Sequence, residues 1–83
     1  MLVTKENAKV GLKIYEAYDD RPIDGCGCKE GIITAVEDDH YLYAIVDLDI
    51  QHVWGFFDVD VEMDSVVVFT TEKEANDWLL KNR

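Results

Sequence analysis

Residues 41–61, YLYAIVDLDIQHVWGFFDVDV, decide the fold, because they hold two extended runs of β-branched and aromatic residues around a short centre. Such runs, separated by two residues, are typical of a β-hairpin. We expect strands over Tyr41–Asp49 and His52–Val61, with Ile50-Gln51 at the turn. The rest of the chain has to supply the partners for this hairpin.

The two faces of the hairpin carry different side chains, because successive residues of a strand point to opposite sides. Pairing across the turn would set Asp47 near Trp54 and Ile45 near Phe56. On the inner face we expect Leu42, Ala44, Val46, Leu48, Val53, Gly55, Phe57, Val59 and Val61. The outer face then carries five large apolar side chains: Tyr41, Tyr43, Ile45, Trp54 and Phe56. Such a patch needs a cover, and the C-terminal helix is the simplest one.

Three further runs predict strands on either side of the hairpin. They are Lys9–Glu16, which places Val10, Leu12 and Ile14 on one face, Gly31–Glu37, and the continuously apolar Ser65–Thr70. Between the first two, Ala17–Lys29 contains Pro22 and Gly25-Cys26-Gly27, which predicts a long loop. Asp38-Asp39-His40 predicts a turn before the hairpin.

A helix is expected at the C-terminal end, over about residues 72–82. Thr71 and Glu74 have the spacing of a capping box, in which each side chain satisfies a backbone donor of the first turn. Ala75, Trp78 and Leu79 follow at helical spacing on one face, which is therefore the face that packs on the sheet.

Five short strands with a terminal helix predict a mainly β fold, a small five-stranded barrel over about residues 9–70. The runs KVGLKIY, GIITAV and YAIVDLD, with a long loop after the first, resemble the opening of an SH3-like small barrel of the KOW or Tudor type. That resemblance covers about residues 9–62 and implies a binding role, with nucleic acid or peptide as the usual ligand. In size and charge the chain is also similar to the small acidic proteins with which bacteriophages bind host proteins.

The chain has 83 residues, which is enough for one domain, 1–83, with one modest core. It has no apolar run long enough to span a bilayer, and its first residues lack the apolar stretch of a signal peptide. Cys26 and Cys28 are too close in sequence for an unstrained disulfide. Together these features predict a protein of a reducing, cytoplasmic compartment.

Charge is distributed unevenly along the chain, whose formal net charge is −10. No Lys or Arg lies between Lys29 and Lys73, whereas that stretch holds Glu30, Glu37, Asp38, Asp39, Asp47, Asp49, Asp58, Asp60, Glu62, Asp64 and Glu72. Nucleic acids and anionic membranes are bound mainly through Lys and Arg. We therefore expect neither of them as a partner, and a protein with a basic surface instead.

The acidic strand end and the outer aromatic face are the candidate binding residues. Asp58, Asp60 and Glu62 recur at every second position, which places their carboxylates about 6.6 Å apart along one face. This spacing suits a row of cations, although a charged strand face also protects against edge-to-edge aggregation. The predicted partner-binding set is Tyr41, Tyr43, Asp47, Asp49, Trp54, Phe56, Asp58, Asp60 and Glu62.

Neither a metal site nor a catalytic site is expected. Cys26, Cys28, His40 and His52 are zinc-ligand types, but in the expected meander the two histidines lie at opposite ends of one strand, more than about 20 Å apart. No glycine-rich phosphate loop is present, and nothing in the sequence brings two carboxylates together in a pocket. We expect no cofactor, no metal and no enzymatic activity.

Three functions compete on these observations. The first is an acidic interaction module that docks on a basic protein and inhibits or modulates it. The second is a structural or assembly protein, a homodimer or larger homo-oligomer that uses the Tyr41/Tyr43/Trp54/Phe56 face. The third is a binder of a small or modified ligand, in which Tyr18, Tyr41, Trp54 and Phe56 form an aromatic cage around a methylated ammonium.

Overall fold

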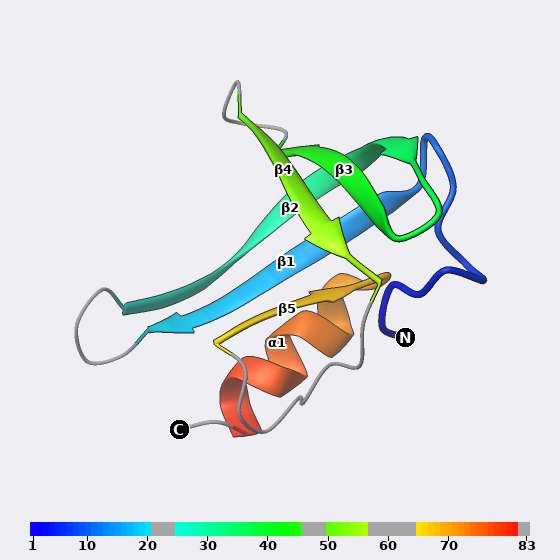
Figure 1. Ribbon diagram of the computed structural model, residues 1–83. Helices are drawn as coiled ribbons and strands as arrows, with labels where there is room; N and C mark the ends of the chain where they lie inside the picture. The colour runs from blue at the N-terminus through cyan, green and yellow to red at the C-terminus, as the bar shows by residue number, and fades with distance from the viewer. Residues whose placement is uncertain (21–24, 46–49, 57–64, 82–83) are drawn as a thin grey trace.

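Five antiparallel strands form one curled sheet, and a single helix packs on it, in the computed structural model of the chain (Figure 1). The structure describes residues 1–20, 25–45, 50–56 and 65–81. Within them lie β1 (Lys13–Asp20), β2 (Gly25–Val36), β3 (His40–Ile45), β4 (Gln51–Gly55), β5 (Val66–Phe69) and α1 (Glu72–Lys81). The spatial order is β4-β3-β2-β1-β5. The predicted mainly β class, with five strands and a C-terminal helix, is confirmed.

The β1–β2 hairpin replaces most of the long loop predicted for Ala17–Lys29. β1 continues to Asp20 and β2 begins at Gly25, so the two strands pair in register from Lys13↔Ile32 to Asp20↔Gly25. Gly27 belongs to this ladder, where it pairs with Tyr18. The ring of Tyr18 lies over it. A Cβ atom at position 27 would lie 2.7 Å from the Tyr18 hydroxyl oxygen. Gly27 thus lies in a strand under the end of the Tyr18 side chain, and not in a loop.

The segment before β1 is a turn, not the start of a strand as predicted. β1 begins at Lys13, four residues later than expected, and Val10 is 66% exposed instead of facing the core. The Leu12 amide donates to the Lys9 carbonyl, and the Gly11 amide donates to the Ile33 carbonyl. The turn is thus fixed to the β2 strand.

The β3–β4 hairpin has a different register from the predicted one. Tyr41 pairs with Trp54 and Tyr43 with His52, so the connection runs from Ile45 to Ile50 and is longer than a two-residue turn. Ile45 therefore does not pair with Phe56, and Asp47 lies outside the described residues. The predicted strand ends at 46–49 and 57–61 lie outside them too.

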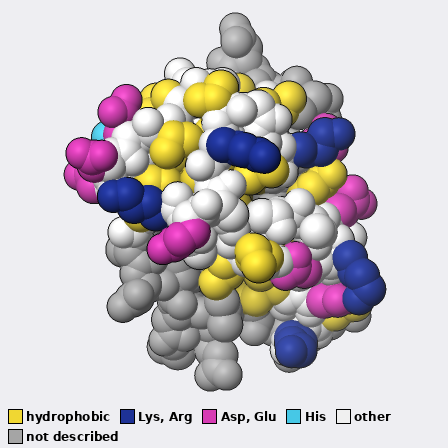
Figure 2. Space-filling model, turned by 90° about the vertical axis from the view of Figure 1, so that its right-hand side faces the viewer, with side chains coloured by type: hydrophobic (Ala, Val, Ile, Leu, Met, Phe, Trp, Pro, Cys, Tyr) yellow, Lys and Arg dark blue, Asp and Glu magenta, His cyan; other side chains and the backbone are white. Residues whose placement is uncertain are grey.

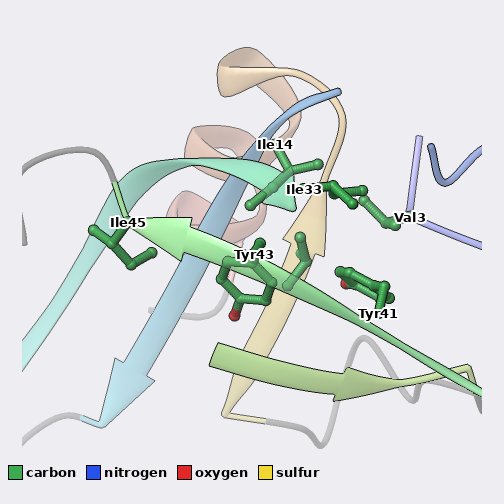
Figure 3. Close-up of a cluster of buried hydrophobic side chains, with 7 residues drawn as sticks. Val3, Ile14, Ile33, Tyr41, Tyr43 and Ile45 are labelled. Atoms are coloured by element: carbon green, nitrogen blue, oxygen red, sulfur yellow. The ribbon is translucent and has the colours of Figure 1, made fainter. Parts of the chain in front are cut away.

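The inner face of the sheet holds the larger core, and the side chains that line it reverse the predicted orientation of the hairpin. Tyr41, Tyr43 and Ile45 are buried, whereas Leu42 and Ala44 are only half-buried. Figure 3 shows the two tyrosines and Ile45 with Val3, Ile14 and Ile33 from the neighbouring segments; Val68 completes the cluster. The prediction failed because the aromatic rings bury more apolar area than Leu42 and Ala44 do.

Gly31 makes room for this inner core. A Cβ atom there would lie 2.9 Å from the Ala44 carbonyl oxygen and 3.0 Å from Ile14 Cδ1. With no side chain at this position, β3 and the Tyr43 ring approach β2 closely.

The second core lies on the outer face, under α1. Trp78 and Ala75 pack with Ala17, Val67 and Phe69. The Glu74 amide donates to the Thr71 hydroxyl oxygen at 3.3 Å, as the capping box predicts for the helix start. However, α1 contacts β1, β2 and β5 and does not reach β3 or β4. The sequence predicted that the helix covers Tyr41, Tyr43, Trp54 and Phe56. This prediction was wrong.

Candidate functional site

The structure separates the predicted binding residues into two groups. Tyr41 and Tyr43 are completely buried, and Trp54 and Phe56 are half-buried against the inner core. The Tyr41 ring stacks on Phe56 with 5.2 Å between centroids. The two tyrosines thus have no side-chain surface to offer a partner or a second copy. The carboxylates of Asp47, Asp49, Asp58, Asp60 and Glu62 lie outside the described residues, and their contact with a partner stays a prediction.

The aromatic cage is not formed by the residues predicted for it. Tyr18 pairs with Gly27 at one end of β2, whereas Tyr41 pairs with Val36 at the other end. Nine residues of extended chain separate these positions, which is roughly 30 Å. In addition, the Lys29 ammonium already lies over the Tyr18 ring, 5.5 Å from its centroid.

The two histidines are closer together than the sequence predicted, because of the changed register. His40 pairs with Gly55, only three residues from His52. Each ring binds a different carboxylate, His40 that of Asp39 and His52 that of Glu16. Among the described residues no group of three or more His, Cys, Asp and Glu side chains is arranged to hold a metal ion.

A buried carboxylate in the inner core is a feature that the sequence analysis missed. Glu16 is buried. Its Oε2 atom accepts a hydrogen bond from the Tyr43 hydroxyl at 2.5 Å and lies 3.0 Å from His52 Nδ1, within hydrogen-bond distance. The signal was available, since Glu16 continues the alternation that places Ile14 on the inner face. A buried carboxylate is tolerated only when it is hydrogen-bonded in this way.

The chemistry of this cluster is structural. Burial raises the pKa of the Tyr43 hydroxyl, and the hydrogen bond to Glu16 raises it further. Burial and the Glu16 charge also raise the pKa of Tyr41. Both phenols therefore keep their protons at neutral pH and cannot act as bases. His52 is the member of the cluster with exposed surface, and it joins β4 to β1 through Glu16.

The outer edge of β4 carries two backbone amides that point away from the sheet. The Ile45 amide donates to the Ile50 carbonyl and the Phe56 amide to the Asp39 carbonyl. In an antiparallel ladder hydrogen-bonded pairs alternate, so His52 and Trp54 bond to β3 and the amides of Gln51 and Val53 point away from it. Gln51 is exposed, and the Val53 side chain is 61% exposed. No described residue pairs with this edge.

An apolar strip lies beside that edge on the outer face. The register places Ile32 opposite Ala44 and Leu42 opposite Val53, all on the outer face, at the end of the sheet where α1 does not contact β3 or β4. Ile32 is 40% exposed. We call Ile32, Leu42, Ala44 and Val53 the outer strip. A register shift between Ile33 and Ala35 adds to the local twist, so the strip curves with the sheet.

The turn between β2 and β3 adds negative charge at the end of β4. Glu37, Asp38 and Asp39 are all exposed, and the Asp39 carbonyl accepts a hydrogen bond from the Phe56 amide. The hydrogen bond from His40 lowers the pKa of the Asp39 carboxyl. Figure 2 shows a face of the molecule on which lysine, acidic and hydrophobic side chains are interspersed. The molecule is therefore not uniformly acidic, and the sign of its charge changes from one part of the surface to another.

Comparison with protein-family models, curated proteins and solved structures gives no significant match to this chain. Within residues 1–20, 25–45, 50–56 and 65–81, no helix has both the length and the apolar character needed to cross a membrane. The functional interpretation therefore starts from the open β4 edge, the outer strip and the acidic turn.

Proposed function

We propose that the chain is an acidic protein-interaction module, built on an SH3-like small barrel of the KOW or Tudor type, which docks on a basic surface of another protein and modulates it. The observation that carries this proposal is the charge distribution: eleven carboxylates and no Lys or Arg between residues 30 and 72. A field of one sign over part of a surface accelerates encounter with an oppositely charged partner. The function is binding, without catalysis or a cofactor.

Two features support a cytoplasmic binding protein over the alternatives. Cys26 and Cys28 are free thiols, as is usual for proteins of a reducing compartment. A homo-oligomer through the Tyr41 and Tyr43 face has lost its support, since both rings are buried. Self-association would also bring together two chains of net charge −10.

The test compares two variants that each remove three negative charges. Asp58→Asn/Asp60→Asn/Glu62→Gln neutralises the acidic strand end, and Glu6→Gln/Asp20→Asn/Asp77→Asn neutralises three carboxylates outside residues 30–72. Partners are isolated from native cytosol with the wild-type chain, eluted in a salt gradient, and their association rates with both variants are measured. We expect the first variant to associate more slowly at low salt, with the difference vanishing as salt rises. Equal rates for both variants would remove the acidic stretch as the docking surface.

A further inference from the structure

The sheet has two edge strands, and the structure treats them differently. The outer edge of β5 is paired with the N-terminal segment: the Val3 amide donates to the Val68 carbonyl, and the Thr70 amide to the Met1 carbonyl. The outer edge of β4 has outward amides at Gln51 and Val53, with exposed side chains and no described pairing partner. An edge of this kind is a template for an additional strand.

β4 also lacks the residues that normally protect an exposed edge. Lysine, proline and bulges interrupt strand addition in most natural sheets. The segment Gln51–Gly55, QHVWG, contains no Lys, Arg or Pro, and its pairing with β3 runs without a register shift. Val53, whose side chain is exposed on the outer face, is apolar and β-branched, which favours extended pairing. The edge is thus suited to binding a strand.

The charged and apolar residues around the β4 edge indicate which side chains an added strand should carry. Glu37, Asp38 and Asp39 are exposed at the Gly55 end of β4, where the Phe56 amide bonds to the Asp39 carbonyl. The outer strip, of which Val53 is part, offers an apolar surface. We propose that β4 binds an extended segment of a partner protein as a sixth strand, with an apolar residue beside Val53 and lysine or arginine beside the acidic turn. This inference rests on the proposed function and specifies how the basic partner docks.

Strand addition explains why binding needs no deep pocket. Main-chain hydrogen bonds supply the affinity, and alternate side chains supply the specificity. The added strand would satisfy the outward amide and carbonyl of Val53 and would cover part of the outer strip. A second copy of the chain is a poorer occupant, because each copy brings the same acidic turn to the same edge.

The test uses a synthetic probe, Ac-Lys-Lys-Thr-Val-Thr-Lys-Lys-NH2, and the same peptide N-methylated at its three central residues. N-methylation keeps the charge and the side chains but removes the backbone donors. Fluorescence anisotropy at low salt measures both peptides against the wild-type chain. We expect the N-methylated peptide to bind at least about tenfold more weakly, since losing one or two hydrogen bonds amounts to that factor. Equal affinities, or no binding of the parent peptide at millimolar concentration, would overturn the inference.

Two substitutions at one position provide the matched test on the protein. Val53→Pro removes the outward amide, and Val53→Thr keeps the amide and replaces one methyl group of the valine with a hydroxyl group. We expect Val53→Pro to bind the parent peptide at least about tenfold more weakly than Val53→Thr. The melting temperature of each variant reports whether it is folded. If Val53→Pro is unfolded, the N-methylated peptide decides the question with the wild-type chain.

A charge pair separates failure of this inference from failure of the proposed function. Glu37→Gln/Asp38→Asn lies beside the edge, whereas Glu6→Gln/Asp77→Asn removes two charges outside residues 30–72. Peptide binding that is weakened only by the first pair, but not by Val53→Pro or N-methylation, rejects strand addition and leaves the acidic module intact. Binding that responds to none of these changes rejects both. Concentration-dependent dimerisation that Val53→Pro abolishes would make a second copy the occupant and overturn the partner assigned here.

Discussion

β5 and β4 are the two edge strands of the same sheet, and their surroundings differ on both sides. β5 pairs with the N-terminal segment along its outer edge and lies under α1, with Val67 buried on one face and Val68 on the other. β4 has its inner face packed, through Trp54, and its outer face and outer edge exposed at Val53. Both ends of the sheet are thus packed on the inner face, whereas among the described residues only the β5 end has its outer face and outer edge covered as well.

The largest expected effect comes from the helix that closes the β5 end. Trp78→Ala removes a buried ring from the outer core and should cost about 3–5 kcal/mol of unfolding free energy. Val53→Ala at the open end should cost no more than about 0.5 kcal/mol, because its side chain is mostly exposed. Urea unfolding of both variants measures the difference. A Trp78→Ala protein that melts within a couple of degrees of wild type would mean that α1 is not docked as described.

Proline at matched edge positions gives the next effect. Val3→Pro removes the amide that bonds to the Val68 carbonyl, at 3.1 Å, and should cost about 2 kcal/mol. Val53→Pro removes an amide that points away from the sheet, and should cost less than about 1 kcal/mol. Val3→Ala and Val53→Ala measure the side-chain part of each change. Equal costs at the two positions would show that both edges are paired.

The inner face joins the two ends of the sheet, and its tyrosines give the molecule a predictable pH dependence. The pKa values of Tyr41 and Tyr43 are raised by burial, and the unfolded value is near 10. The unfolded chain therefore loses these protons first as pH rises. Their contribution to the free energy of unfolding should therefore be constant below about pH 10. Above that pH it should fall, by up to ~1.4 kcal/mol per pH unit for each of the two tyrosines.

Urea unfolding at several pH values from about 9 to 11 measures that slope. Tyr43→Phe is the control, because it removes one of the two titrating groups and keeps the ring. We expect the slope of this variant to be smaller than that of wild type. A stability that stays constant over this range would contradict the burial of the two hydroxyl groups.

The last prediction concerns nucleic acid, for which we expect no binding. We predict no binding of duplex DNA or RNA at about 0.15 M salt, because the basic residues are few and the 30–72 stretch has none. The open β4 edge is beside acidic residues and would repel phosphate. A gel shift at micromolar protein measures this. A clear retarded band would assign the open end to a different class of ligand.

The fold class, the C-terminal helix and the doubly buried β5 strand could be predicted from sequence. Ser65–Thr70 is continuously apolar, and two successive valines contact the two cores, Val67 the outer one and Val68 the inner one. Thr71 and Glu74 marked the helix start. These elements depend on local patterns of hydrophobicity and capping, which a single sequence contains.

Register and facing could not be predicted, because they depend on residues far apart in the chain. Gly27 was interpreted as loop punctuation, whereas it lies under Tyr18 nine residues earlier. Tyr43 could be assigned to the core only with knowledge of Glu16, which accepts its hydroxyl proton in a hydrogen bond. The hydrophobic alternation of β3 permits either face, and the partner on β1 selects one.

The central claim, that the outer edge of β4 has no pairing partner among the described residues and accepts an added strand, is tested most directly by amide hydrogen exchange of the free protein, measured residue by residue by NMR. His52 and Trp54 bond to β3, and the amides of Gln51 and Val53 point outward. We predict slow exchange at His52 and Trp54 and fast exchange at Gln51 and Val53, with the last two slowed on addition of the lysine peptide. Equal protection of Val53 and Trp54 in the free protein would contradict the open edge and, with it, the proposed mode of binding.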